Sequence, residues 1–145
     1  MSETVYQQAI KALAEAAHGS GRLEHPDGCS RLDNPLCGDR ISLTVRLEGD
    51  VIAAVRHETR ACLLCRAAAS LVALRAPGRS RAEMADVAAA LEAMLSAAAP
   101  PPPAWKELEA FAPVSSHPSR HGCVLLPFKA LNAALASSGG NPAGQ

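Results

Sequence analysis

Three cysteines in three different sequence settings are the residues of this chain best suited to chemistry. Cys37 lies within residues 34–40 (Asn-Pro-Leu-Cys-Gly-Asp-Arg), Cys62 opens a helical stretch, and Cys123 follows an Arg-His-Gly sequence. A thiolate is a good ligand for zinc or iron, and it is also the nucleophile that accepts sulfane sulfur. Soft metals take three or four such donors, and Asp39 is a candidate for the fourth. These four residues therefore predict a metal or sulfur site.

Length and charge limit the classes of protein to which the chain can belong. A chain of 145 residues that is 48% hydrophobic is the right size for one domain with one core. Its 14 basic and 14 acidic residues balance, so it presents no net field to attract a polyanion. We therefore expect no nucleic-acid partner and no membrane partner.

The cellular compartment follows from the amino-terminal sequence and the cysteine count. Residues 1–18 mix charged and polar side chains among apolar ones, unlike a secretory signal. No apolar run approaches the roughly 20 residues that span a bilayer. An odd number of cysteines, five, without an export signal favours reduced thiols over a disulfide framework. We expect a soluble, cytoplasmic protein.

The first half of the chain predicts a helix, an irregular segment and a hairpin. Apolar residues at helical spacing predict an amphipathic helix over residues 3–18. Residues 20–39 show turn residues and little periodicity, which places Cys37 in a loop. Strict alternation over residues 41–47, a tight loop, and β-favouring residues 51–59 then predict an antiparallel hairpin.

The second half changes to helical periodicity. A helix is predicted over residues 62–75 with Cys62 in its first turn, where the positive end of the helix dipole stabilises a thiolate. Ser80 and Glu83 are spaced as a capping box that opens a third helix. A short helix is predicted around residues 105–111. A last one is predicted over residues 125–135, with Pro127 in its first turn and Cys123 just before it. We expect one domain over residues 1–136 and a disordered tail over residues 137–145.

Several of these features together resemble the NifU N-terminal domain family, the IscU and SufU group of iron–sulfur assembly proteins. The similar features are the sequence Asn-Pro-Leu-Cys-Gly-Asp-Arg-Ile over residues 34–41, the hairpin after it, Cys62 opening an Ala/Ser-rich helix, and Cys123 before a carboxy-terminal helix. The resemblance covers roughly residues 20–135. The long interval from Cys62 to Cys123 is more similar to SufU than to IscU.

The resemblance implies an α+β fold of the SufE/NifU-like type. It consists of a small antiparallel β-sheet of two to three strands packed against about four to five helices. Because the stretch between His25 and Cys37 is short beside typical family members, we expect the first family strand to be clipped or missing.

Carried over to this chain, the resemblance implies that Cys37, Asp39, Cys62 and Cys123 form the metal site. In SufU-like proteins these positions hold zinc (Zn2+), and in IscU-like scaffolds they hold a transient [2Fe–2S] cluster. The sulfur acceptor is Cys37 or Cys123, and the implied partners are a cysteine desulfurase and apo iron–sulfur acceptor proteins.

Three functions remain, and the first is the one we adopt. It is a scaffold, not an enzyme, that binds a nascent cluster through three cysteines and an aspartate and accepts sulfur from the desulfurase. The second is a zinc-dependent sulfurtransferase that relays persulfide sulfur. The third is a structural zinc-binding domain, disfavoured because structural zinc usually uses close ligand pairs.

Two further residues are candidate ligands at this site. Cys65 follows Cys62 at i+3 on the predicted helix, so it is either a small buried apolar residue or a spare ligand or resolving thiol. His121 is displaced by one residue from the family histidine, where this chain has Gly122, and is either an extra ligand or a solvated loop histidine. Cys29 is expected to be an incidental thiol.

Overall fold

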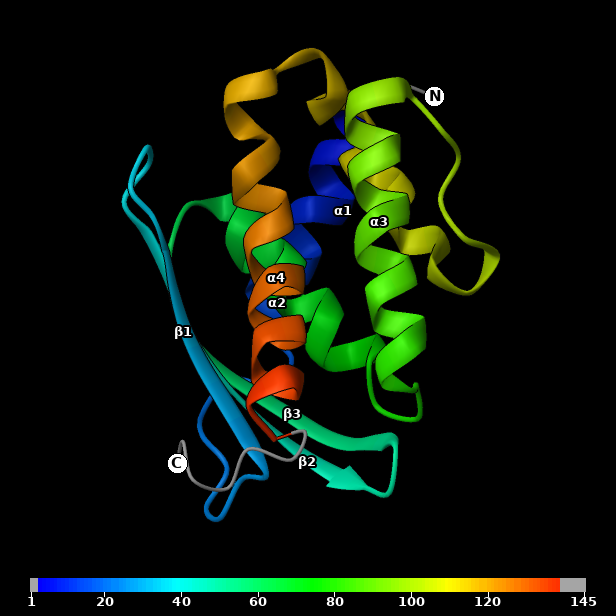
Figure 1. Ribbon diagram of the computed structural model, residues 1–145. Coiled ribbons are helices and arrows are strands. Elements are labelled where there is room, and N and C mark those ends of the chain that lie inside the picture. The colour runs from blue at the N-terminus through cyan, green and yellow to red at the C-terminus, as the bar shows by residue number, and fades with distance from the viewer. Residues whose placement is uncertain (1–2, 139–145) are drawn as a thin grey trace.

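A three-stranded sheet covered on one face by helices is the framework of the protein. The computed structural model describes residues 3–138, and Figure 1 shows the helices gathered on one side of the strands. None of the helices in these residues is long and apolar enough to cross a membrane. The elements follow in the order α1 (Glu3–Ala16), β1 (Gly28–Asn34), β2 (Asp39–Glu48), β3 (Val51–Arg60), α2 (Leu63–Arg75), α3 (Arg81–Ala97), the 3-10 segments η1 (Pro103–Ser116) and η2 (Pro118–Arg120), and α4 (His121–Ser138).

The sheet is an antiparallel meander in the order β1-β2-β3. Its second and third strands are the predicted hairpin. Ile41, Leu43 and Val45 of β2 are buried beneath the helices, whereas the alternate residues Arg40 and Arg46 are exposed. The alternation in the sequence therefore predicts the face beneath the helices correctly. On the other face Thr44 is also buried, and its hydroxyl accepts a hydrogen bond from the Leu23 N–H at 3.1 Å.

The strand β1 lies in the segment that we expected to be irregular. The sequence Gly-Cys-Ser-Arg-Leu-Asp-Asn has little apolar alternation, and it is held to α4 by other means. The Ser30 hydroxyl donates to the Ala130 carbonyl at 2.7 Å, and the Cys29 N–H donates to Ser137 Oγ at 3.1 Å. A Cβ on Gly28 would overlap the Ala134 carbonyl, so the strand approaches the helix through a glycine. The expectation of a clipped or missing strand is wrong, and the sheet has three strands.

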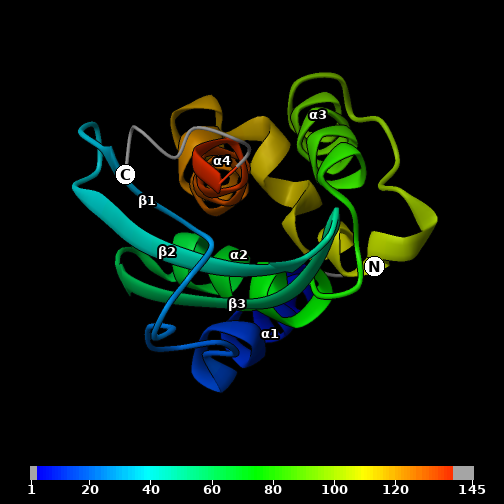
Figure 2. The same ribbon diagram turned by 60° about the horizontal axis from the view of Figure 1, so that its bottom comes forward.

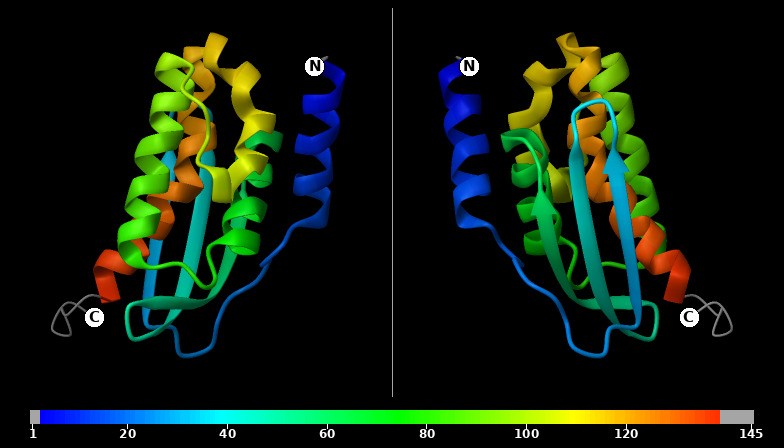
Figure 3. Two further views of the ribbon diagram at one scale, coloured as in Figure 1. Left: turned by 90° about the vertical axis from the view of Figure 1, so that its right-hand side faces the viewer. Right: turned by 90° about the vertical axis from the view of Figure 1, so that its left-hand side faces the viewer.

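The helix α2 is buried between its neighbours. It contacts α1 on one side, and α4 and β3 on others, and Figure 3 shows α4, α2 and α1 following one another across the molecule. Four consecutive small residues, 67–70 (Ala-Ala-Ala-Ser), are all buried on α2. The Ser70 hydroxyl accepts a hydrogen bond from the His18 N–H at 3.0 Å. The Ala/Ser-rich sequence thus allows three elements to pack closely around one helix.

The last helix begins four residues earlier than predicted. It runs from His121 to Ser138 along the covered face of the sheet (Figure 2), so Cys123 lies inside its first turn rather than before it. Pro127 falls in the second turn and lacks the N–H that would pair with the Cys123 carbonyl. Burial outweighs this loss, because Phe128 packs on Trp105 with ring centroids 5.8 Å apart. Of the tail predicted over residues 137–145, the first two residues belong to α4, and residues 139–145 lie outside the described residues.

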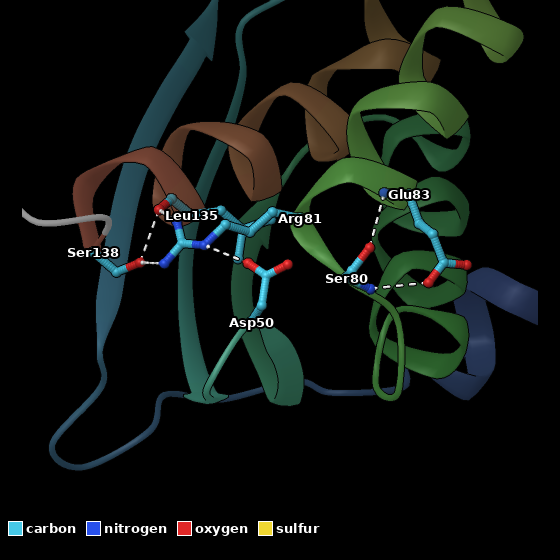
Figure 4. Close-up of polar contacts among 6 residues, drawn as sticks. All are labelled: Asp50, Ser80, Arg81, Glu83, Leu135 and Ser138. Atoms are coloured by element: carbon cyan, nitrogen blue, oxygen red, sulfur yellow. Dashed lines mark hydrogen bonds and ion pairs between the residues drawn. The ribbon is translucent and has the colours of Figure 1, made fainter.

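The capping box predicted at the start of α3 is present. The Ser80 hydroxyl accepts from the Glu83 N–H at 3.2 Å, and the Ser80 N–H donates to Glu83 Oε1 at 3.1 Å (Figure 4). The helix itself leaves these two backbone N–H groups without partners, and the two side chains accept their hydrogen bonds. A local sequence signal is enough to fix this helix start.

One arginine ties three elements together next to that cap. The Arg81 guanidinium donates to the Leu135 carbonyl near the end of α4 and, at 3.0 Å, to Ser138 Oγ. It also pairs with Asp50 of the β2–β3 turn at 3.3 Å, as Figure 4 shows. A guanidinium is well suited to the free carbonyls at a helix end. We call the region of Arg81, Asp50 and Leu135 the Arg81 end of the sheet.

Candidate metal centre

Three chain segments converge at the opposite end of the sheet. The turn of residues 35–38 joins β1 to β2 and carries Cys37, and Asp39 is the first residue of β2. Cys62 is the residue before α2, where the chain leaves β3, and Cys123 is in the first turn of α4. We call the region of Cys37, Asp39, Cys62 and Cys123 the cysteine end of the sheet.

The side chains of these four residues meet. The Cys37 and Cys123 sulfurs are 3.1 Å apart, and the Cys37 thiol contacts Asp39 Oδ2 at 3.0 Å. The Cys62 thiol contacts the same oxygen at 3.6 Å. Ligand atoms of Cys37, Asp39 and Cys123 all lie within 4.8 Å of one another, and all five cysteines are free thiols. Residues 86 positions apart in sequence thus share one small site.

Asp39 is fixed in orientation by the start of α2. Its Oδ1 accepts a hydrogen bond from the Cys62 N–H at 2.9 Å, which leaves Oδ2 facing the thiols. The residue is only 2% exposed. Burial raises the pKa of Asp39, but hydrogen bonds from the Cys37 thiol and the Cys62 N–H outweigh it and hold the pKa below its ordinary value. Asp39 is therefore a carboxylate with one oxygen available at the site.

Cys37 is the exposed member of the cluster. Its turn closes with hydrogen bonds from the N–H groups of Cys37 and Gly38 to the Asn34 carbonyl, at 3.3 and 2.9 Å. Gly38 has φ +72°, a left-handed conformation that glycine adopts without strain. The neighbouring Leu36 is 89% exposed. The centre is therefore open to solvent on the side of this turn.

A glycine allows α4 to approach that turn. A Cβ on Gly122 would lie 2.9 Å from Asn34 Nδ2. Asn34 is itself part of the turn, because its Oδ1 accepts from the Leu36 N–H at 3.2 Å. The glycine next to Cys123, which the sequence marks only as a departure from the family histidine, thus permits the contact that brings Cys123 to Cys37. The residues next to Gly122 in the sequence do not predict that it packs against Asn34.

Two of the thiols at the centre, Cys37 and Cys123, have raised pKa values. Burial raises the pKa of Cys123, and hydrogen bonds with Cys37 and Asp39 raise it further. Partial burial and the contact with the Asp39 carboxylate raise the pKa of Cys37. A divalent cation favours the deprotonated ligands, so metal binding and thiol deprotonation are coupled here.

The donor set fits a single soft ion. Tetrahedral zinc with Zn–S bonds near 2.3 Å requires ligand atoms about 3.8 Å apart. The contacts of 3.0 and 3.1 Å within the group of Cys37, Asp39 and Cys123, whose ligand atoms all lie within 4.8 Å of one another, are close to that spacing. Cys62 lies beside this group, with its sulfur 3.6 Å from Asp39 Oδ2. Three thiols and one carboxylate are donors that zinc and iron accept.

The remaining candidates from the sequence lie outside this cluster. The ring Nε2 of His121 faces the carbonyls of Val114 and Ser115, at 3.1 and 3.2 Å. Cys29 is exposed on β1. Cys65 is 0% exposed within the core, where burial, and then the charges of Asp39 and the neighbouring cysteines, raise its pKa. Its burial agrees with the small apolar role that the sequence favoured.

Fold and site together define a class of protein: an α+β domain with a centre of thiols and one carboxylate at the end of a three-stranded meander. Residues 5–101 match the family described as the NifU-like N terminal domain. The chain belongs to this family. The match ends before α4, which carries Cys123 of the centre.

Characterised relatives cover nearly the whole chain. The zinc-dependent sulfurtransferase SufU of Bacillus subtilis is 28% identical over 96% of this chain and 95% of its own length. The iron–sulfur cluster assembly scaffold protein IscU of Streptococcus pyogenes is 30% identical over 92% of this chain and 84% of its own. The relatives therefore include both kinds of protein that the resemblance raised.

Solved structures agree on the fold. A NifU-like protein (N-terminal) from Brucella abortus has a TM-score of 0.88 and 26% identity, covering 94% of this chain and 97% of its own. A putative iron–sulfur cluster assembly scaffold protein for the SUF system from Fervidobacterium islandicum has a TM-score of 0.80 and 25% identity, covering 93% and 99%. The three-stranded sheet with its helices is the fold of these proteins.

Proposed function

We propose that this protein is an iron–sulfur cluster assembly scaffold that accepts sulfur from a cysteine desulfurase. The observation that carries the proposal is the convergence of Cys37, Asp39, Cys62 and Cys123 at one end of the sheet, open to solvent beside Cys37. Iron and sulfide are the substrates of this activity, and the thiols are ligands that both clusters and single iron ions accept. Apo iron–sulfur proteins are the proposed acceptors.

Cys37 is the better placed of the two candidate sulfur acceptors. It is exposed on a turn, whereas Cys123 is 3% exposed in the first turn of α4. Sulfur transfer requires the Cys37 thiolate to attack the outer sulfur of a persulfide held by the desulfurase. The sulfur–sulfur bond breaks, the desulfurase cysteine leaves as a thiolate, and the persulfide is then on Cys37. A partner protein can reach Cys37 without opening the core.

Asp39 gives the site a ligand that is easily given up. Carboxylate is a harder donor than thiolate and suits iron less well. Its hydrogen bond from the Cys62 N–H holds Oδ2 toward the sulfurs before any ion arrives. An oriented but weak fourth ligand supports a site from which a cluster must later leave.

A second candidate function is zinc-dependent sulfur transfer. It is supported by the close spacing of the donor atoms, which suits a single ion. It is also supported by the similarity to the zinc-dependent sulfurtransferase of Bacillus subtilis. Bound zinc would hold the thiols as thiolates and order the turn that carries Cys37. In that function the residues of this chain bind the ion, keep Cys37 deprotonated, and release it to attack the persulfide.

The test uses anaerobically purified wild type, Cys37→Ser and Cys29→Ser. Each protein is mixed with a cysteine desulfurase, cysteine and ferrous iron, and its iron, zinc and acid-labile sulfide are measured. The scaffold predicts a cluster in wild type and Cys29→Ser that passes to an apo-ferredoxin, and its loss in Cys37→Ser. Zinc that resists replacement, with stimulated desulfurase turnover and no cluster, would favour the sulfurtransferase. Cluster formation undiminished in Cys37→Ser would overturn the role given to Cys37.

A further inference from the structure

A second thiol lies one turn below the metal centre. Cys62 and Cys65 form a Cys-Leu-Leu-Cys sequence at the start of α2. Cys62 is the capping residue, partly exposed and extended at ψ 168°, whereas Cys65 is fully buried. The candidate metal centre includes Cys62 but not Cys65.

Helical geometry gives the two cysteines a spacing that a disulfide can bridge. The Arg66 N–H donates to the Cys62 carbonyl at 3.0 Å, so Cys62 is fixed to the first helical turn. Residues three apart in such a turn have Cα atoms about 5 Å apart, inside the range that a disulfide bridges. Cys-x-x-Cys sequences and helix starts are both settings in which thiols take part in disulfide exchange. This spacing therefore permits a bond between Cys62 and Cys65.

We propose that Cys62 and Cys65 are a dithiol pair that reduces sulfane sulfur on Cys62 to sulfide. The proposal rests on the proposed function, which delivers sulfur to Cys37. Cys37 and Cys62 contact the same carboxylate oxygen, at 3.0 and 3.6 Å, and the transfer requires the exposed Cys37 side chain to turn toward Cys62. Attack of the Cys62 thiolate on the outer sulfur of a Cys37 persulfide moves that sulfur to Cys62, and Cys37 leaves as a thiolate.

The reducing step balances within the pair. The Cys65 sulfur, having given up its proton, attacks Sγ of the Cys62 persulfide, and a Cys62–Cys65 disulfide forms. The sulfur–sulfur bond of the persulfide breaks, and its outer sulfur takes the electron pair and the proton and leaves as hydrosulfide. Cys65 is oxidised to the disulfide level, and the sulfane sulfur is reduced to sulfide. A dithiol reductant restores the pair by exchange at the partly exposed Cys62.

The burial of Cys65 suits it to this one reaction. With no exposed surface, its sulfur cannot be reached by solvent oxidants or by a partner protein. Its neighbour Cys62 is the thiol that the helix brings to it. The pair would generate sulfide next to the iron ligands and would withdraw Cys62 from the metal until a reductant restores it.

The reaction is carried out on the full-length protein, and digestion with trypsin then shows the state of the Cys62–Cys65 pair. Cleavage after Arg60 and Arg66 releases residues 61–66 (Ala-Cys-Leu-Leu-Cys-Arg), which contain both cysteines and no other. The metal-free, reduced protein is treated anaerobically with sodium polysulfide, or with desulfurase and cysteine, and free thiols are then blocked. Sulfide and the blocked or oxidised peptide are measured for wild type, Cys65→Ala and the matched control Cys29→Ala.

Wild type and Cys29→Ala are expected to release about one sulfide per chain without added reductant, while the peptide loses two hydrogen atoms and resists blocking. Cys65→Ala is expected to keep the persulfide and release sulfide only after a dithiol is added. Unchanged sulfide release in Cys65→Ala, or a wild-type peptide that stays reduced with both donors, would overturn the pair. Disulfide and sulfide with polysulfide but not with desulfurase would uphold the pair and count against the proposed function.

Discussion

The two ends of the sheet are built in opposite ways. At the Arg81 end, Arg81 joins the end of α4 to the β2–β3 turn, and a complete capping box opens α3. At the cysteine end, an exposed turn carries Cys37, and the contacts among the side chains are weak thiol contacts to Asp39 and Cys123. One end is closed by strong hydrogen bonds, and the other is held open.

The contrast supports the labile metal centre that we propose at the cysteine end. Regions with few buried contacts and exposed turns open at low free-energy cost, whereas well-packed regions open only with the whole fold. If the Arg81 end supplies stability, ligands at the cysteine end can change partners without unfolding the chain.

The largest effect is expected on metal affinity in Cys37→Ser. The substitution removes one thiolate from the donor set, and zinc affinity should fall by at least about 100-fold, since even residues behind the ligands contribute 10- to 100-fold. Because Cys37 is exposed, the metal-free protein should keep its unfolding free energy within about 0.5 kcal/mol. Competition with a chelator measures the affinity, and urea unfolding the stability.

Cys29→Ser is the matched control for that variant. It also removes an exposed thiol, from the neighbouring strand β1 but outside the cluster. Its zinc affinity should equal that of wild type. Equal losses in the two variants would mean that the cysteine end is not the metal centre.

The next largest effect is expected in Gly28→Ala, which should lower the unfolding free energy without changing the zinc affinity. The new Cβ would meet the backbone carbonyl of Ala134, which cannot move aside as a side chain can. Overpacking of this kind costs about 2–3 kcal/mol of unfolding free energy. Cys29→Ala, next on the strand and exposed, should cost little. If Gly28→Ala weakened zinc binding in the folded protein as strongly as Cys37→Ser, the two ends would not be independent.

A smaller loss is expected at the capping box. Ser80→Ala removes the acceptor for the Glu83 N–H and should cost about 1 kcal/mol of unfolding free energy. Ser96 is the matched control on the same helix, because its hydroxyl donates to the Glu92 carbonyl within a turn that is already complete. Urea unfolding should show the loss for Ser80→Ala and almost none for Ser96→Ala. Similar losses in the two variants would mean that the capping box does not stabilise the Arg81 end.

The same contrast separates what the sequence predicts from what it does not. The hairpin of β2 and β3 and the start of α3 follow local rules, namely alternation over residues 41–47 and the Ser80–Glu83 spacing, and both predictions are confirmed. The strand β1 has no such pattern. It is held by Ser30, by the backbone of Cys29 and by the close approach at Gly28, contacts to α4 about 100 residues away that no local window contains.

At the candidate site, residue types were more informative than boundaries. Their chemistry alone singles out Cys37, Asp39, Cys62 and Cys123. The structure brings the side chains of Cys37, Asp39 and Cys123 together, with the Cys62 thiol in contact with Asp39. The start of α4 was misplaced because Pro127 predicts an early helix position, while burial of residues such as Phe128 extends the helix past it. The role of Gly122 depends on the position of Asn34 in space, and a single sequence carries no sign of it.

The smallest effect concerns a titratable group between the two ends. His57 of β3 is buried, and its Nε2–H donates to the His18 carbonyl at 2.8 Å while Nδ1 pairs with Thr59 Oγ1 at 2.8 Å. Burial lowers the pKa of His57 below its usual 6.5, and the hydrogen bond to His18 only partly opposes this.

The sign of the pH dependence follows from that lowered pKa. Below the usual value of 6.5 the unfolded chain takes up a proton at His57 that the folded chain does not. The unfolding free energy should therefore be constant above that pH and should fall as the pH drops toward the lower pKa of the folded state. Urea unfolding of metal-free protein between about pH 5 and pH 8 measures this. His57→Gln should flatten the slope, and an equal slope in that variant would place the titrating group elsewhere.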